Sequence, residues 1–289
     1  MIDPKDQDLP LDEMSLGSKA QARDSYLPHE EKSQEIHEGQ LRFCRKSLTL
    51  DVATCLADLS PLAGKWKDLW KNDPDTTPFQ STAWLLAYVR AFRPAVLRIL
   101  LVRRRDKLIG IFPFLVENSC AHRVLRILGG DLSDYLDGLC REEDRAEVSE
   151  LVEIWLAEQL RHCDCAEFAQ LRPNAALRSI PRPNIFKEQL FPGTSCPAVP
   201  LRAPHFGAAR FLPKSMRKNI ERRRRNLEHA GTIRFDVADE DSLDKALSIL
   251  FLLHAKRWQR RGFSGVFKTS QKQRFYREAF SRIEASVSD

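Results

Sequence analysis

The sequence has no long apolar run. A membrane-spanning helix needs about 18 or more consecutive apolar residues, and the longest candidate, AVLRILLV, is interrupted by Arg98. The N-terminal stretch is polar and lacks the apolar core of a secretion signal. These absences together predict a cytoplasmic protein without a membrane span.

The seven cysteines lack the pattern of a metal site or a disulfide framework. They are odd in number and scattered, with no paired CxxC units and no histidines at ligand spacing. Cys163 and Cys165 could bind a metal ion, but no second pair of cysteines lies near them in the sequence. We therefore expect reduced thiols in cores and no metal.

Apolar residues are scarce in residues 1–40, which contain ten acidic and four basic residues. Such a segment cannot bury enough apolar surface to offset the entropy lost on ordering, so we predict a disordered acidic tail. Since the whole chain carries a net charge of +6, the remainder is strongly basic. An anionic partner is plausible for that remainder, although net charge governs solubility before it governs function.

Residues 41–201 combine strand and helix patterns. Ser60–Pro61 and Ser81 are typical of helix starts, and the second of these helices is predicted to end at Phe92. A third helix is expected over 142–161. Strands are predicted over 41–50, 95–104, 107–117, 123–128, 135–140 and 166–172. This order predicts a mixed α/β (α+β) fold with helices packed on a central sheet.

Two proline-rich stretches then indicate a crossing into a second unit over 205–289. This unit is predicted to contain a basic helix from Pro213, one strand over 232–239, and helices over 242–261 and 269–283. A single strand leaves both of its edges unpaired, and the apolar stripe of the 242–261 helix needs a sheet to cover. The first unit, a partner chain or further sequence would have to supply that sheet.

Five stretches, in this order, resemble one family: TPFQSTAWLLAYVRAF, LVRRRDKLIGIFPFL, RILGGDLSDYLDGL, LPKSMRKNIERRRRNLEHAG and LLHAKRWQRRGFSGVF. The chain resembles the GNAT-superfamily acyltransferases of the CelD/FemAB-like branch over residues 45 to 285. The resemblance implies tandem GNAT-like domains, at 41–201 and 205–289, separated by a cleft. Members of this family continue beyond the last motif, so the resemblance also implies that the second domain is truncated.

The resemblance further implies acyl transfer from acetyl-CoA or another acyl-CoA to an amine. The acceptor would be a small molecule or a saccharide, in polysaccharide or cell-envelope biosynthesis, and aminoacyl-tRNA is a second candidate donor. A CoA pyrophosphate needs free backbone N–H groups, usually beside a glycine-rich turn. No such turn follows Gly231, and the adjacent glycines near a strand end are Gly129 and Gly130. A non-catalytic remnant or interaction subunit is therefore the alternative.

His254, Arg257 and Trp258 lie on the helix predicted over 242–261. Under the family resemblance this helix lines the cleft, where His254 could take a proton from an amine and Trp258 could offer a stacking surface. Arg257 would bind an anionic substrate. The alternative, that Trp258 belongs to the core and His254 is a satisfied edge histidine, stays open.

The stretch GGDLSDYLDG is a second candidate. Loops at strand ends collect binding groups, and an acidic cluster here could hold an amine acceptor through Asp134, Tyr135 and Asp137. Ordinary turn chemistry explains the same composition equally well.

The basic helix has a narrow apolar line through Met216, Ile220 and Leu227, which we expect to pack. The consecutive arginines 222–225 point around the whole circumference, so some are solvated or pair with glutamates. Lys214, Ser215 and Arg217 lie at the N-terminal end, where the helix dipole attracts an anionic donor or acceptor. No aromatic platform accompanies the helix, which argues against nucleic-acid binding. The oligomeric state is left open.

Overall fold

The computed structural model describes residues 35–37, 40–45, 47–73, 75–119, 122–183, 186–193, 195–196 and 212–287. Most of the predicted acidic tail, residues 1–34, lies outside the described residues. The tail was predicted to extend to residue 40, yet Glu35–His37 already form a strand, so this boundary was set too late.

The described part of the chain contains an eight-stranded mixed sheet with the order β1-β2-β3-β4-β5-β6-β8, and β7 also pairs with β5. All neighbours are antiparallel except β6 and β8, which are parallel. The strands are β1 (Glu35–His37), β2 (Gln40–Arg45), β3 (Leu48–Ala53), β4 (Val96–Arg104), β5 (Lys107–Ser119), β6 (His122–Ile127), β7 (Leu139–Cys140) and β8 (Cys165–Glu167).

The α-helices of the described residues are α1 (Leu56–Leu59), α2 (Ala63–Lys71), α3 (Thr82–Phe92), α4 (Arg145–Gln159), α6 (Lys214–Ala230), α7 (Leu243–Gln259) and α8 (Ser270–Val287). Most were predicted. The expected cap of α3 is present, because the Ser81 Oγ accepts a hydrogen bond from the Trp84 N–H at 3.3 Å. The mixed α/β class is confirmed.

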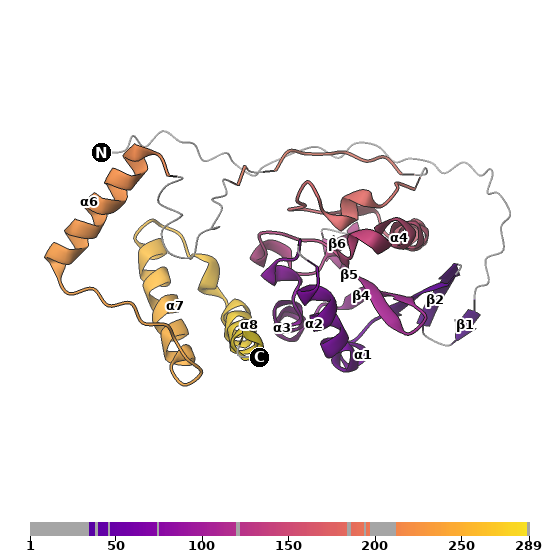
Figure 1. The fold of residues 1–289 in the computed structure, drawn as a ribbon, viewed down its shortest axis with the longest axis horizontal. Helices are drawn as coiled ribbons and strands as arrows, with labels where there is room; N and C mark the ends of the chain where they lie inside the picture. Colours follow the sequence, from indigo (N-terminus) through magenta and orange to yellow (C-terminus); the bar gives the residue numbers. More distant parts are fainter. Residues whose placement is uncertain are drawn as a thin grey trace. The chain divides into compact units, whose positions relative to one another are not determined.

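The central strands β4 and β5 are buried on both faces. In β4, Ile99 and Leu101 belong to one core while Leu100 and Val102 belong to another, as the twofold periodicity of a strand requires. Helices α1, α2 and α3 cover the first core and α4 covers the second, on opposite sides of the sheet (Figure 1). The strong apolar runs of these two strands follow from this double coverage.

Several predicted strands differ in the structure. The stretch 41–50 divides into β2 and β3, which pair with each other because three polar residues, RKS, interrupt its alternation. The strand predicted over 135–140 shortens to β7, because the Asp137 carboxylate is bonded to backbone outside the sheet. The strand predicted over 166–172 is three residues long, β8, and residues 168–172 form no strand.

Residues 232–239 form no strand, although one was predicted there. The alternating apolar residues Ile233, Phe235 and Val237 are present as expected. However, no backbone hydrogen bond between described residues involves 232–238, so the pattern lacks a neighbouring strand with which to form a ladder.

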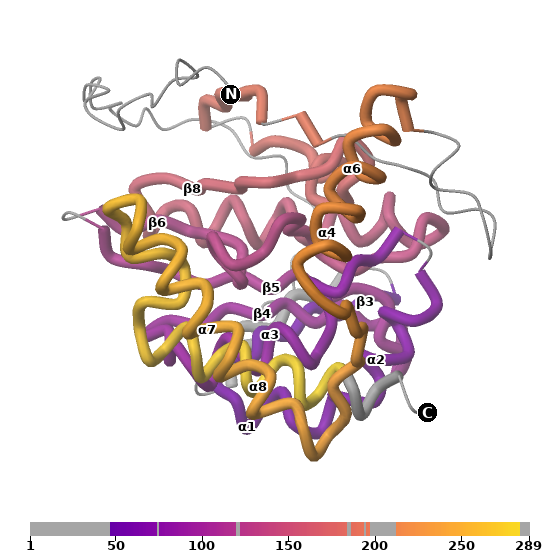
Figure 2. The backbone as a smooth tube through the Cα atoms, turned by 90° about the vertical axis from the view of Figure 1, so that its left-hand side faces the viewer, coloured from indigo at the N-terminus to yellow at the C-terminus, as the bar shows by residue number. Residues whose placement is uncertain are grey.

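Helix α8 packs into the first core beside α3 (Figures 1 and 2). Phe275 and Ala279 are fully buried there. The Phe275 ring meets Trp84 edge-on, with 4.7 Å between the ring centroids. The sheet-bearing part of the chain therefore covers α8 through α3. The cover that the sequence left open was that of the apolar stripe on the 242–261 helix, not that of α8.

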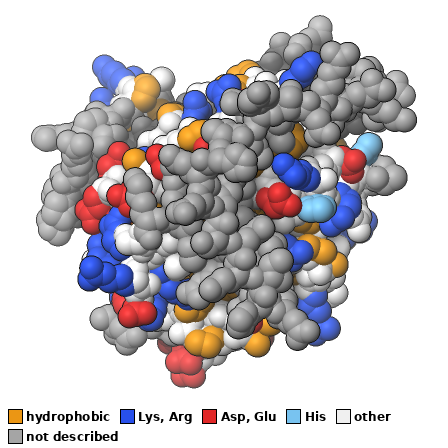
Figure 3. All heavy atoms as spheres, turned by 90° about the vertical axis from the view of Figure 1, so that its right-hand side faces the viewer, with side chains coloured by type: hydrophobic (Ala, Val, Ile, Leu, Met, Phe, Trp, Pro, Cys, Tyr) orange, Lys and Arg blue, Asp and Glu red, His pale blue; other side chains and the backbone are white. Residues whose placement is uncertain are grey.

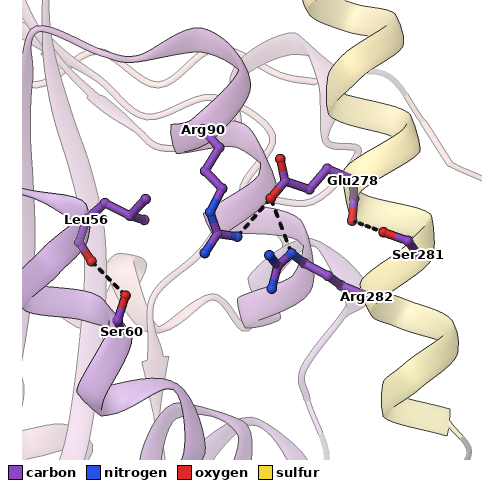
Figure 4. A network of polar contacts seen from close by, with 6 residues as sticks. All are labelled: Leu56, Ser60, Arg90, Glu278, Ser281 and Arg282. Carbon is purple, nitrogen blue, oxygen red and sulfur yellow. Dashed lines mark hydrogen bonds and ion pairs between the residues drawn. The ribbon is translucent and has the colours of Figure 1, made fainter.

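An ion pair joins α8 to α3 at the margin of this contact (Figure 4). The Arg90 Nη1 lies 2.9 Å from the Glu278 Oε1, and the same oxygen lies 3.3 Å from the Arg282 Nε. All three side chains are partly exposed, so this network orients α8 more than it stabilises the fold.

Helices α6 and α7 are less covered. On α7, Leu247 and Phe251 are buried, whereas Leu250 of the predicted stripe is exposed. No described residue of α6 is buried, and the apolar line expected to pack is exposed. The predicted pairing of α6 arginines with glutamates does occur, between Arg224 and Glu228 at 2.8 Å.

Candidate functional site

The C-terminal end of α7 borders a surface hollow of about 640 Å³. A short 3₁₀ turn, η7 (Val266–Lys268), closes its other side. The hollow is lined by Phe251, Leu252, His254, Ala255, Gln259, Gly262, Phe263, Ser264, Phe267, Lys268 and Gln273. Its lining is divided about evenly between apolar side chains and polar ones, the latter being His254, Gln259, Ser264, Lys268 and Gln273.

Two aromatic rings and one glycine hold His254 in this hollow. The ring centroid of His254 lies 4.6 Å from that of Phe267 and 5.9 Å from that of Trp258. Gly265 has φ +73°, and a Cβ added there would lie 2.5 Å from the His254 Cε1. Because only glycine permits both this backbone conformation and this approach, Gly265 fixes the position of the imidazole.

The two nitrogens of His254 differ in their surroundings. The Nδ1 is buried and has no hydrogen-bond partner among the described residues. A protonated imidazole carries a hydrogen on both nitrogens, and a buried N–H without an acceptor is costly. A ring with its hydrogen on Nε2 avoids this cost and presents the Nε2–H as a hydrogen-bond donor.

Lys268 is the cationic residue in the lining of the hollow, and Arg257 and Arg261 lie near the lining residues in the sequence. The Arg261 guanidinium lies 5.7 Å from the centre of the Trp258 ring, within cation–π range. Arg257 is exposed and makes no ion pair with another described residue, so its charge is available to an anion. Trp258 lies beside His254, whereas Arg257 is not among the residues that line the hollow, so its role as a binding residue stays a prediction.

The loop after β6 meets α8. Gly129 and Gly130 have φ +116° and +50°, and they turn the chain so that Ser133 accepts a hydrogen bond from the Trp84 Nε1–H at 2.9 Å. The Asp131 carboxylate lies 3.5 Å from the Lys272 ammonium of α8. The glycine pair thus anchors residues 129–138, called the acidic loop below, against α3 and α8.

Of the predicted acidic residues, Asp134 is exposed and Asp137 is buried. The Asp137 carboxylate accepts three backbone hydrogen bonds, from Gly138, Ala176 and Leu177. Burial raises the pKa of Asp137, against the lowering effect of these bonds. Asp137 is therefore an anchor for the chain near residue 176, and its oxygens are not available to a substrate.

Tyr135 is partly buried. Its ring centroid lies 6.3 Å from that of Phe79, and the Arg172 guanidinium lies 5.9 Å from the centre of its ring. These contacts pack the Tyr135 ring against other residues of the chain. Asp134 is thus the predicted acidic-loop residue that remains free to meet an acceptor.

An aromatic contact chain connects the hollow to the acidic loop. Phe267, which touches His254, lies 5.0 Å from Tyr276 of α8 in an edge-on contact. Burial, followed by the charges of Asp134 and Asp131, raises the pKa of Tyr276. The structure therefore brings His254 and Asp134, separated by 120 positions in the sequence, to the two ends of one aromatic cluster on α8.

The predicted anion-binding residues Lys214, Ser215 and Arg217 lie in the first turns of α6, and all three are exposed. No contact within the described residues joins them to the hollow or to the acidic loop. Figure 3 draws the face on the side away from α6, and in its coloured part basic, acidic and hydrophobic side chains lie interspersed. The unpaired positive charge of α6 is thus a separate feature from the hollow.

Phe267, Lys272 and Tyr276 were missed from the sequence. Lys272 and Tyr276 lie beside the loop after β6 because α8 packs on α3, which the helical periodicity of KTSQKQRFYREAF does not show by itself. The consecutive aromatic pair Phe275–Tyr276 was the available signal, since one ring enters the core and the next lies beside the acidic loop.

Residues 214–287 match the family model of the acetyltransferase (GNAT) domain. The match covers α6, α7 and α8, and therefore includes the hollow, but not the sheet. No curated protein and no solved structure matches the chain.

Neither a membrane span nor a metal cluster is found in the described residues. None of the helices there is long and apolar enough to cross a membrane. No group of three or more His, Cys, Asp and Glu side chains among the same residues is placed to hold a metal ion.

Proposed function

We propose that this protein transfers an acyl group from acyl-CoA to an amine, at the hollow beside His254. The observation that carries the proposal is that the stretch matching the acetyltransferase (GNAT) domain contains this hollow and its polar groups. GNAT-type domains generally use acyl-CoA as co-substrate. The same match supports an amine acceptor, and direct transfer without an acyl-enzyme is part of the proposal.

The reaction needs few groups from the protein. The neutral amine attacks the thioester carbonyl, the C–S bond breaks, and the departing CoA thiolate takes the proton that the amine loses. Negative charge develops on the carbonyl oxygen in between, and a positioned hydrogen-bond donor stabilises it. We assign this task to the Nε2–H of His254. The sequence suggested that His254 acts as a base, but its buried Nδ1 has no hydrogen-bond partner among the described residues, which favours the donor role.

Asp134 is the proposed acceptor anchor. Its carboxylate is exposed, and its charge adds to the effect of burial in raising the pKa of Tyr276. Attraction between Asp134 and an ammonium group would concentrate the acceptor beside the hollow. For the donor, Lys268 offers positive charge at the hollow, and the exposed Arg257 offers another on α7. Lys214, Ser215 and Arg217 offer a second, separate anion-binding subsite at the start of α6.

The test is release of the CoA thiol from acetyl-CoA in the presence of a panel of amines, including amino sugars. We expect release with at least one amine. Replacing His254 by Ala should lower kcat about a hundredfold, with the exposed His229→Ala, in the same matched segment, as the unaffected control. His254→Gln, which keeps an N–H donor, should retain more activity than His254→Ala. If His254→Gln and His254→Ala lose activity equally, the base role is favoured. If no amine in the panel gives thiol release, the proposal of acyl transfer is wrong.

The finer assignments belong to the same proposal. The order of the five motifs supports the CelD/FemAB-like branch, a tandem arrangement and a role in polysaccharide or cell-envelope assembly. Activity on amino sugars but not on polyamines or peptides would support that role. The cytoplasmic location also remains a prediction from the sequence.

A non-catalytic interaction subunit is the second candidate. It is favoured by the absence, among described residues 212–287, of any strand in the segment that matches the acetyltransferase domain. Failure of both acetyl-CoA binding and thiol release, together with stable self-association, would favour this candidate over the first.

A further inference from the structure

We propose that residues 232–238 pair with the same residues of a second copy of this chain, as two antiparallel strands related by a twofold axis at Phe235. This inference is independent of acyl transfer. It concerns the segment between α6 and α7, which the sequence predicts as a strand and which forms none in the single chain.

The segment has the side-chain pattern of a strand. Phe235 and Val237 are almost completely exposed, at 95% and 97%, and Ile233 is also exposed. The intervening Arg234 and Asp236 contact each other, with 3.1 Å between the Arg234 Nη2 and the Asp236 Oδ1. Contact between positions i and i+2 places both on one side of the backbone, and the alternation places the apolar residues on the other.

The backbone of this segment is also free to pair. No backbone hydrogen bond within the described residues involves 232–238. The next residue, Asp239, is bonded to Ser242 at the start of α7, so the free stretch ends there. Unpaired backbone beside exposed β-forming side chains is a template for strand addition.

The order of residues is complementary to itself. In an antiparallel pair centred on Phe235, each Arg234 lies opposite the Asp236 of the other copy, each Ile233 lies opposite a Val237, and Phe235 faces Phe235. Arg234 and Asp236 from the two copies then form a square of alternating charges, in which each charge adjoins two opposite ones. Directly opposed residues on paired strands contact one another, and opposite charges there are favourable.

The other face of the ribbon would gather six apolar side chains, three from each copy. Burying them removes from water the most exposed aromatic ring among the described residues. Because a two-stranded ribbon alone is marginal, the expected dimer is weak and dependent on concentration. A second copy fits better than an unrelated strand, since the charge order Arg-Phe-Asp finds its complement in itself.

Sedimentation velocity of the full chain over a range of concentrations tests the pairing. We expect a monomer–dimer equilibrium. Arg234→Asp places two carboxylates opposite each other on both sides of the axis, and it should raise the dissociation constant about tenfold or more. The charge-exchanged variant Arg234→Asp/Asp236→Arg restores complementarity and should return the constant to near that of the native chain. A chain that stays monomeric throughout, or equal weakening in both variants, overturns the proposal.

Cysteine crosslinking tests the register. In the proposed pairing residue 235 faces itself, so Phe235→Cys should form a disulfide-linked dimer under mild oxidation. Val237→Cys is the matched control, because residue 237 is equally exposed but lies opposite Ile233. The native chain under the same conditions measures crosslinking through its own cysteines. Equal crosslinking of Phe235→Cys and Val237→Cys would exclude the twofold register.

Discussion

Replacing Phe275 by Ala tests whether α8 belongs to the core of the sheet-bearing part. The side chain is fully buried, and its ring centroid lies 4.7 Å from Trp84 and 6.0 Å from Phe92, both on α3. Phe→Ala at such sites costs about 3–5 kcal/mol, because the lost transfer energy and the remaining cavity add. We expect the upper half of this range, since edge-on aromatic pairs contribute beyond their buried area.

The assay is urea unfolding of the full chain, followed by tryptophan fluorescence. Phe280→Ala is the matched control, because Phe280 lies on the same helix but is 38% exposed, and it should cost about 1 kcal/mol or less. Phe275→Leu keeps most of the volume and should cost less than Phe275→Ala, which guards against complete unfolding. If Phe275→Ala and Phe280→Ala are equally mild, α8 does not pack into this core.

Two further predictions concern Tyr88 and Gly265. Burial raises the pKa of Tyr88 from 10.0 to about 12. The stability that its neutral phenol contributes is therefore present below pH 10 and is lost as the pH rises toward 12. In unfolding titrations over this interval, the native chain should lose about 2–3 kcal/mol of unfolding free energy that Tyr88→Phe does not lose. Gly265→Ala forces a Cβ against the His254 ring at φ +73°, and should destabilise the chain by about 1–3 kcal/mol, whereas Gly193→Ala, with nothing within 4 Å, should be neutral.

The fold of residues 47–183 could be predicted closely because its signals are local. The Ser81 cap, the doubly apolar strands β4 and β5, and the turn between them each depend on a few neighbouring residues. The segment 232–239 shows the limit of this reasoning. Its alternation was interpreted correctly as strand-forming, but a strand also needs a neighbour, and the local sequence does not specify whether one is present.

The candidate site was predictable only in part. His254, Arg257 and Trp258 could be proposed together because they share one helix, and Asp134 because it follows a glycine pair; their roles stay predictions. Their common neighbourhood depends on α8, whose placement is a tertiary contact between Phe275 and α3. Asp137 was misassigned as a substrate-binding residue, because the sequence cannot distinguish a carboxylate that is saturated by distant backbone N–H groups from a free one.

Binding of acetyl-CoA to the full chain tests the central claim most directly, because it requires no knowledge of the acceptor. Titration calorimetry should show one saturable site per chain, with an affinity that falls as salt screens the cationic groups around the hollow. Replacing Lys268 by Glu should weaken this binding, and Lys65→Glu on the distant α2 should not. The absence of saturable binding at low salt would contradict acyl transfer at this hollow.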